Sequence, residues 1–69
     1  MSETPLAALR KRRDLSQTDV AATLAVSQPY ISHLERHVDP KLSRIESFVD
    51  ALGGRLEVRV VFDDETIAL

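Results

Sequence analysis

The chain has 69 residues, no cysteine, two histidines and a formal net charge of −2. The absence of cysteine excludes disulfides, and two histidines cannot complete a structural zinc site, which usually needs about four side-chain ligands. A domain this small buries little apolar surface, so we expect oligomerisation to supply part of its stability. Residues 1–44 carry seven basic and five acidic residues, whereas residues 45–69 carry two and six. The N-terminal part therefore remains eligible for phosphate binding, which depends on a local basic surface.

Several classes of protein are excluded by what the sequence lacks. No apolar run approaches the roughly 18 to 20 residues of a membrane span, and the N-terminus lacks the apolar core of a signal peptide. We therefore expect a cytoplasmic protein that does not bind membranes. The chain also has no cysteine nucleophile, no phosphate-cradling loop and no glycine motif to support a Ser-His-Asp triad. We expect no enzymatic activity, no catalytic residues and no cofactor.

The first predicted helix begins near the N-terminus, where Thr4 can cap it and Pro5 can occupy its first position. Leu6 and Leu9 form a short apolar stripe. The basic run at residues 10–13 follows, where positive charge complements the negative end of the helix dipole. This run has two interpretations: a solvated helix end, or a set of direct phosphate contacts.

The second predicted helix covers residues 17–24. Ser16 and Asp19, three residues apart, resemble a capping box, although aspartate is shorter than the usual glutamate or glutamine. The inward face that the spacing predicts consists of Val20, Ala21 and Leu24.

A third helix follows after a short turn at residues 25–27. We expect Val26 to fasten this turn to the core and Ser27 to cap the helix. Pro29 would fall at the second helical position, where its missing N–H costs little. Ile31 and Leu34 would point inward. The outward positions, which share one face by their spacing, are Gln28, Pro29, Ser32, His33 and Arg36.

This outward face carries small polar side chains where a merely solvated helix usually carries lysine and glutamate. Gln28 can pair with the major-groove edge of adenine, and Ser32 and His33 can donate or accept single hydrogen bonds. Pro29 can contact a thymine methyl group. The two helices and their turn therefore predict a helix-turn-helix whose second helix reads base edges in DNA.

The segment from Leu9 to Leu52 resembles the Cro/C1-type (XRE) helix-turn-helix family. The residues that carry the resemblance are Leu15-Ser16-Gln17, Ala21, Val26-Ser27-Gln28, Ile31-Ser32 and Leu34-Glu35-Arg36. The resemblance implies a mostly α fold with a four-helix domain of the lambda-repressor-like type. By position it implies that Gln28, Pro29 and His33 face base edges, with Ser32 at a base edge or a phosphate. For phosphate contacts, the set that we expect is Gln17, Ser27, Tyr30, Arg36 and Arg13.

Two positions depart from the pattern of that family, which usually has glycine where Ala25 and His37 stand. Ala25 fits at modest cost if the turn avoids a left-handed backbone, and His37 must adopt a left-handed conformation or belong to a differently shaped loop. His33 and His37 also lie four residues apart around Glu35. Their order differs from the His-Glu-x-x-His of zinc hydrolases and no further ligand completes the set, so we expect no metal site.

The last predicted helix covers residues 41–52 and is stopped by Gly53-Gly54. Ser43 and Glu46 have the spacing of a capping box, and an alternative start lies at Asp39-Pro40. The residues that we expect to pack inward are Ile45, Phe48, Val49 and Leu52.

After the glycines the apolar period changes to two, which predicts a strand over residues 55–62. One face consists of Leu56, Val58, Val60 and Phe62, whereas the opposite face is mainly charged. Residues 63–65 can turn the chain so that residues 66–69 return as a short strand. An isolated hairpin is marginal in water, so we expect this apolar face to pair with a second copy as a dimer interface.

These patterns predict a DNA-binding domain at residues 1–53 and a dimerisation element, a β-strand or hairpin, at residues 54–69. A two-fold dimer would place two recognition helices about one DNA turn apart on a palindromic operator, as a repressor does. The helix-turn-helix followed by Ala-Leu-Gly-Gly and a strand is also similar to antitoxins of the HigA and HipB kinds, which implies a toxin partner. Two alternatives stay open: a stand-alone or phage-type repressor, and a protein–protein interaction module.

Overall fold

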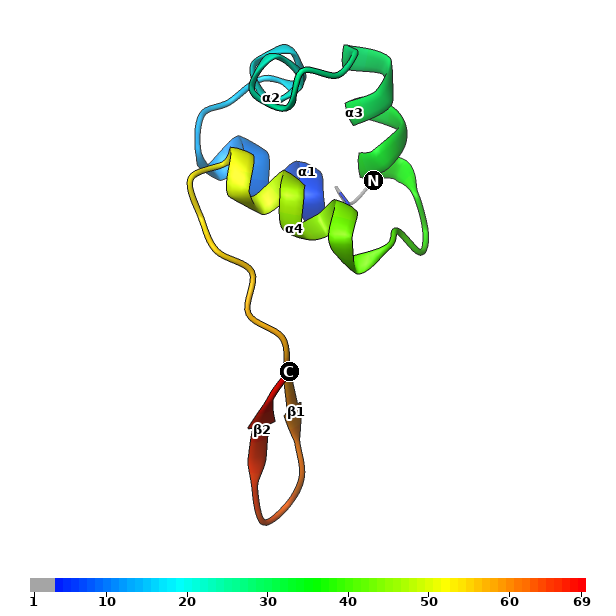
Figure 1. Ribbon diagram of the computed structural model, residues 1–69. Coiled ribbons are helices and arrows are strands. Elements are labelled where there is room, and N and C mark those ends of the chain that lie inside the picture. The colour runs from blue at the N-terminus through cyan, green and yellow to red at the C-terminus, as the bar shows by residue number, and fades with distance from the viewer. Residues whose placement is uncertain (1–3) are drawn as a thin grey trace.

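The computed structural model describes residues 4–69 and shows four helices followed by a small hairpin (Figure 1). The predicted mostly α fold with a four-helix domain and a C-terminal hairpin is confirmed. The hairpin projects away from the helices on an extended segment, so that the molecule measures 43 × 27 × 21 Å. The elements are α1 (Pro5–Arg12), α2 (Gln17–Leu24), α3 (Gln28–Arg36), α4 (Leu42–Ala51), β1 (Arg59–Val61) and β2 (Thr66–Ala68).

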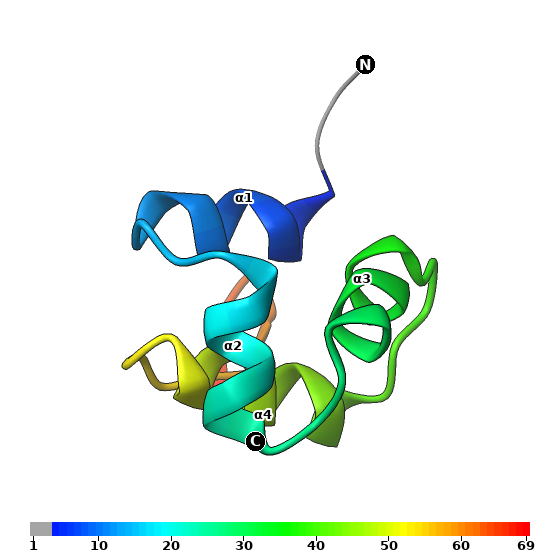
Figure 2. The ribbon, with the colours of Figure 1, turned by 90° about the horizontal axis from the view of Figure 1, so that it is seen from above.

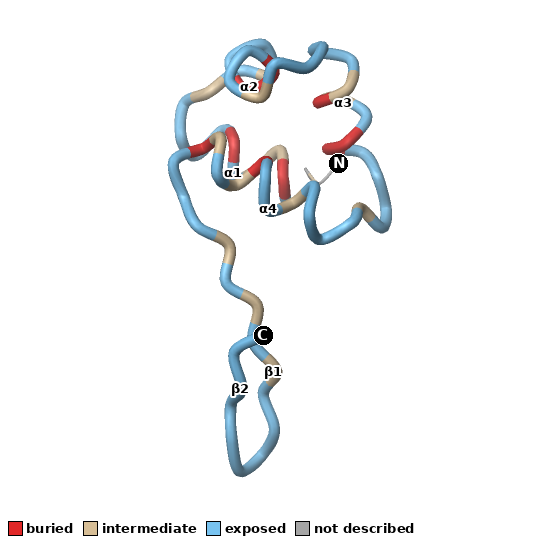
Figure 3. Tube along the Cα trace, viewed as in Figure 1, coloured by how far each residue is buried: buried red, intermediate tan, exposed pale blue. Residues whose placement is uncertain are grey.

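The core lies between the four helices, whose inward sides are the buried parts of the chain (Figure 3). Phe48 and Ile31 are fully buried at its centre, and Val20 is almost so. The buried apolar residues are Leu6, Val20, Ala21, Ile31, Leu34, Phe48 and Leu52. Because each helix contributes at least one of them, the helical body holds together as one packing unit.

Three of the four helix starts agree with the sequence prediction because a side chain caps each of them. The Thr4 hydroxyl accepts a hydrogen bond from the Ala7 amide, and the Ser27 hydroxyl accepts one from Tyr30. Ser16 and Asp19 form the predicted capping box, with backbone N–H to side-chain oxygen distances of 2.8 and 3.0 Å. The backbone and side-chain hydrogen bonds from Ser16 hold the pKa of the Asp19 carboxyl below its ordinary value.

The start of α4 differs from the prediction. The helix begins at Leu42 with Lys41 as its N-cap, and no side chain caps it. Ser43 already lies inside the helix, so its hydroxyl cannot cap the first turn and the predicted box with Glu46 is wrong. The helix ends as predicted at the glycines, where Gly53 takes a φ of +85° that favours a residue without a Cβ.

Leu9 of the predicted apolar stripe and Val26, which we expected to fasten the turn to the core, both lie at the surface. Leu9 is 42% exposed because Arg10, four residues after Leu6, takes the inward position on α1. Val26 is 37% exposed, since the turn between α2 and α3 carries it to the rim of the core. Both residues leave apolar surface on the outside of the helical body.

The hairpin is shorter than the predicted strand. Residues 54–58 have no neighbouring strand for most of their length, so only the end of the predicted strand forms a ladder. Phe62 donates its amide to the Glu65 carbonyl at 2.7 Å across the predicted turn. The antiparallel register places Arg59 opposite Ala68, Val60 opposite Ile67, and Val61 opposite Thr66.

The expected alternation of exposure is present over most of this segment. Leu56, Val58 and Val60 are half-buried, whereas Glu57 and Arg59 between them are exposed. Phe62 at the end is 54% exposed. Among residues 4–69, no helix is long and apolar enough to cross a membrane.

Candidate nucleic-acid interface

Helices α2 and α3 are joined by a three-residue turn whose geometry depends on Ala25. This residue adopts a left-handed backbone, with φ 56° and ψ 43°, and the Val26 amide then donates to the Ala21 carbonyl at 2.9 Å. We expected alanine to fit here at modest cost only if the turn avoided a left-handed backbone. The observed turn does not avoid it. An L-residue with a Cβ carries a strain of about 1–2 kcal/mol there. The turn is held by the helices on either side of it.

Helix α3 runs along the outside of the helical body next to α2 (Figure 2). Its inward side is the buried Ile31, Leu34 and Glu35. The residues predicted to read bases lie on the opposite side: Gln28, Pro29 and His33 are exposed, and Ser32 is half-buried. These four side chains therefore lie on the outer side of one helix.

A buried ion pair that the sequence did not reveal supports this helix from behind. Arg10 and Glu35 are 8% and 4% exposed, and the Arg10 Nε lies 2.6 Å from Glu35 Oε2. A second guanidinium nitrogen of Arg10 donates to Glu35 Oε1 at 3.2 Å, and a third donates to the Leu15 carbonyl at 2.8 Å. Both interpretations of Arg10, as a solvated end and as a phosphate contact, are therefore wrong. The available signal was its position four residues after Leu6, on the inward face of α1.

Two glutamines connect the ion pair to the surface by hydrogen bonds. Gln17 donates from its amide nitrogen to Glu35 Oε1 at 3.0 Å, and its amide oxygen accepts a hydrogen bond from the Gln28 amide nitrogen. Because Glu35 is only an acceptor, the Gln17 amide must turn its NH₂ group inward and its oxygen outward. This orientation fixes how Gln28 presents its own amide on the reading side of α3. No buried side-chain nitrogen or oxygen within residues 4–69 lacks a partner.

The predicted phosphate contacts are only partly brought together. Gln17, Ser27 and Tyr30 lie at or beside the start of α3, and Arg36 is exposed at its end. Tyr30 contacts Arg44 of α4, whose guanidinium donates to the phenol oxygen and lies 5.6 Å from the ring centre. Arg13 instead borders a groove at the far end of α4, beside Leu52 and the glycines, and is not grouped with α3.

The loop after α3 does not place His37 in a left-handed conformation. It has a different shape from the loop in which the family usually has glycine, which is the second of the two possibilities given above. His37 has an extended backbone, with φ −69° and ψ 131°, so glycine is not required there. Its ring lies edge-on to His33, with 5.6 Å between ring centres. Over residues 4–69, no three His, Cys, Asp or Glu side chains are grouped so that they could hold a metal ion.

Comparison with known proteins connects this geometry to a family. The sequence profile of the helix-turn-helix family matches residues 6–58. Antitoxin HigA1 of Mycobacterium tuberculosis, in strains CDC 1551 and H37Rv, is 43% identical over 63 residues, which is 90% of this chain. The match covers 41% of the HigA1 sequence, so this chain spans less than half the length of those relatives.

Two solved structures resemble the whole chain. A HigA antitoxin described as inducing DNA bending by unique dimerization has a TM-score of 0.87 and 35% identity, with 100% of this chain and 93% of that chain covered. The DNA-bound antitoxin HigA3 has a TM-score of 0.88 and 33% identity, with 100% and 91% covered. Both similarities extend over the hairpin as well as the helices.

Proposed function

Because the chain belongs to the Cro/C1-type (XRE) helix-turn-helix family, we propose that it is a sequence-specific DNA-binding regulator that acts as a homodimer. The family is non-enzymatic. The observation that carries the proposal is the connection from the buried Arg10–Glu35 pair through Gln17 to Gln28. A surface side chain that is positioned from the core in this way is suited to recognition, because little conformational freedom is lost on binding.

The orientation of Gln28 matches what an adenine edge requires. Its amide nitrogen uses one hydrogen for Gln17 and keeps a second, and its oxygen remains unused by Gln17. Adenine presents N7 as an acceptor and N6–H₂ as a donor in the major groove, so one glutamine amide can bind both atoms. In this proposal Gln28 reads adenine, while Pro29, Ser32 and His33 contact neighbouring bases.

Phosphate contacts hold α3 in the groove. Ser27 and Tyr30 lie at the start of α3, whose N-terminus favours negative charge, and Arg36 lies at its other end. Gln17 acts in this proposal by orienting Gln28, because its amide nitrogen is turned inward to Glu35 and its oxygen accepts from Gln28. Arg13 contributes through long-range attraction, since it lies apart from α3.

The hairpin supplies the dimer interface in this proposal. Its apolar side consists of Val60 on β1, Ile67 opposite it on β2, and the flanking residues Leu56, Val58 and Phe62. Two strands do not form a stable sheet alone in water, and a second copy of the same face would cover these side chains. A HigA antitoxin of 35% identity is described as dimerizing, which supports a dimer for this chain.

An antitoxin role is favoured over that of a stand-alone or phage-type repressor by the names of the relatives. An antitoxin of this kind would repress its own operon and bind the toxin that the operon encodes. Co-expression with the product of the adjacent reading frame tests this choice. A stable complex that relieves growth arrest supports the antitoxin role, whereas no complex and no rescue would leave the stand-alone repressor.

A titration of fluorescent duplexes tests DNA binding itself. The measurement uses the full chain, fluorescence anisotropy, several salt concentrations, and both random duplexes and duplexes selected by the protein. The proposal requires a clear preference for selected duplexes and an affinity that falls as salt rises. Equal affinity for all duplexes at low and moderate salt would favour a protein–protein interaction module instead.

A further inference from the structure

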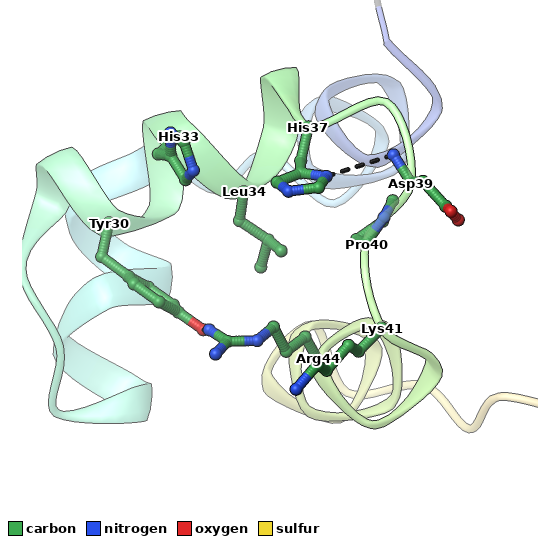
Figure 4. Close-up of a pocket in the computed structure, with 8 residues that line it drawn as sticks. All are labelled: Tyr30, His33, Leu34, His37, Asp39, Pro40, Lys41 and Arg44. Carbon is green, nitrogen blue, oxygen red and sulfur yellow. Dashed lines mark hydrogen bonds between the residues drawn. The ribbon is translucent and has the colours of Figure 1, made fainter.

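Two of the hollows on the surface of the helical body differ in their relation to α3. One, of about 300 Å³, opens between the second half of α3, the loop after it and the first turn of α4, with His33 and His37 on its wall (Figure 4). It borders the reading side of α3 and belongs to the site already described. The other, of about 360 Å³, lies between the C-terminal ends of α1 and α4, apart from α3. We call it the α1–α4 groove.

The α1–α4 groove has an apolar lining and a basic rim. Its apolar residues are Leu9, Val49 and Leu52, and Leu9 is 42% exposed. Arg12 and Arg13 form the rim, and both are exposed. Within residues 4–69, neither guanidinium takes part in an ion pair. A partner that fits this groove combines an apolar side chain with negative charge.

The tip of the hairpin, residues 62–65, has that composition. Phe62 begins the tip and is 54% exposed. The turn after it consists of Asp63, Asp64 and Glu65, which are all exposed and form no ion pair within the described part of the chain. The tip therefore joins one large apolar side chain to a formal charge of −3, whereas the two arginines of the groove rim carry +2.

The tip of the same chain does not lie at the groove. Figure 1 shows the hairpin projecting away from the ends of α1 and α4, with its tip at the far end of the molecule. The base of this projecting arm is Gly54, which lines the groove. If two such arms pack antiparallel about a two-fold axis, each tip lies beside the base of the other arm. A second copy can therefore bring its tip to the groove.

The two-fold axis of this arrangement falls on the apolar part of the arm. When Asp64 of one copy lies beside Gly54 of the other, the axis passes Arg59, which is halfway between them in the chain. Val58 of each copy then lies next to Val60 of the other, and both side chains are only half-buried within one chain. The same packing therefore covers apolar side chains of the hairpin and delivers each tip to a groove.

We propose that the α1–α4 groove receives the hairpin tip of a second copy, with Phe62 on the apolar lining and the acidic turn against Arg12 and Arg13. The inference rests on the homodimer proposed above and gives the helical body a share in its interface. Residues 54–58 begin with glycine and lack a neighbouring strand for most of their length, so the arm alone does not fix the body. A tip held in each groove sets the distance between the two copies of α3.

Charge reversal tests the contact and includes its own rescue. One variant carries Arg12→Glu with Arg13→Glu, and the other carries Asp63→Arg with Asp64→Arg. Each variant alone has like charges in both contacts of its homodimer, so the dimer dissociation constant should rise at least about tenfold. In an equimolar mixture both contacts of a heterodimer are attractive, and its dissociation constant should return to within about threefold of the wild type.

Sedimentation velocity gives the dissociation constants, native mass spectrometry distinguishes heterodimers from homodimers, and circular dichroism checks that each variant is folded. The matched control is Arg36→Glu with Lys41→Glu. It makes the same change in net charge at exposed positions at the end of α3 and before α4, far along α4 from the groove. The control should dimerise like the wild type.

The absence of cysteine from the chain allows a second test that does not depend on charge. Chains with Arg13→Cys are mixed with chains that carry Asp64→Cys, and the mixture is oxidised. A disulfide between the two kinds of chain should form, whereas either variant alone should give little cross-linked product. Thr18→Cys on α2 replaces Arg13→Cys in the control mixture, which should not cross-link with Asp64→Cys.

The outcomes separate this inference from the proposed homodimer. Weakened homodimers, a restored mixture and the expected cross-link support the docked tip. Dimers that survive both charge reversals, a mixture that is not restored, or no cross-link would overturn it and leave the apolar side of the hairpin as the interface. In that case the groove is open to an acidic segment of another protein. If the wild type is a monomer at all concentrations, the homodimer proposal fails and this inference fails with it.

Discussion

The helical body buries its apolar side chains, whereas the hairpin leaves several of its own exposed. The body buries side chains from all four helices, and Phe48 and Ile31 have no exposed surface. The hairpin has three paired residues in each strand and leaves Phe62, Ile67 and Leu69 between 44% and 81% exposed. The body is therefore complete within one chain, whereas the hairpin has the composition of an element that is completed by a partner.

The largest expected effect comes from breaking the buried ion pair of the helical body. Glu35→Ala leaves the Arg10 guanidinium buried without its counterion, and the free energy of unfolding should fall by about 3–5 kcal/mol. Urea unfolding followed by circular dichroism measures this loss. The control replaces both partners, Arg10→Met with Glu35→Leu, which should restore most of the stability because no buried charge remains. A stable single variant would show that the pair is not buried in solution.

The next prediction concerns the hairpin and should leave the body folded. Val60→Lys places a charge on the proposed interface, and the dimer dissociation constant should rise at least about 100-fold, or roughly 3 kcal/mol. Light scattering measures the mass, and circular dichroism checks the helices. Val61→Lys is the matched control, since Val61 lies on the opposite face of the same strand and is 72% exposed. Equal dimerisation of both variants would place the interface elsewhere.

Gln28→Ala probes the surface of the body instead. The variant should fold like the wild type and lose about 1–3 kcal/mol of discrimination at one base pair in each half-site. Competition binding against duplexes changed at single positions measures this loss. Thr18→Ala, an exposed change on α2, should leave discrimination as it is. If Gln28→Ala discriminates like the wild type, α3 does not read bases through this residue.

Removing the N-cap of α2 should lower the stability by a smaller amount, and the loss should depend on pH. Ser16→Ala removes half of the capping box and should cost about 1 kcal/mol at neutral pH. Because the pKa of Asp19 is lowered in the folded state, its carboxylate stabilises the fold above its ordinary pKa, and this contribution is lost as pH falls through the lowered value. Thermal unfolding at several pH values should show a weaker acid dependence in the variant. Ser43→Ala, which touches the box that does not form, should change little.

The smallest prediction is a gain. Ala25→Gly relieves the left-handed strain in the turn, and after the higher chain entropy of glycine is subtracted the stability should rise by up to about 1 kcal/mol. Thermal melts of the variant beside the wild type measure the change. Ala22→Gly, inside α2, should instead lose about 1 kcal/mol. A loss in both variants would mean that the backbone at residue 25 is not left-handed.

Much of the fold could be predicted from the sequence because local signals were strong. The caps at Thr4, Ser16 and Ser27 fixed three helix starts, and the change of apolar period after Gly54 indicated the hairpin. The start of α4 was misplaced because Ser43 and Glu46 have the spacing of a capping box whether or not the helix begins there. Spacing alone does not say which of two nearby residues begins a helix.

The exposed residues of α3 were predicted from the sequence, but the buried ion pair behind them was not. Exposed positions on α3 followed from the helical period, whereas the Arg10–Glu35 pair joins residues 25 positions apart, which no local pattern reveals. Arg10 was hidden in a basic run, where a solvated or phosphate-binding role is the usual interpretation. The pocket at His37 likewise depends on how a loop folds back onto α4, which only the three-dimensional structure shows.

In the proposed function, two copies of α3, joined through the hairpins, read a symmetric DNA site. Selection of bound duplexes from a random pool, followed by sequencing, tests this geometry. We expect two inverted copies of one half-site with centres about 10 base pairs apart, each containing an adenine whose selection is lost in Gln28→Ala. Enrichment of a single unrepeated half-site, or of no sequence at all, would contradict it.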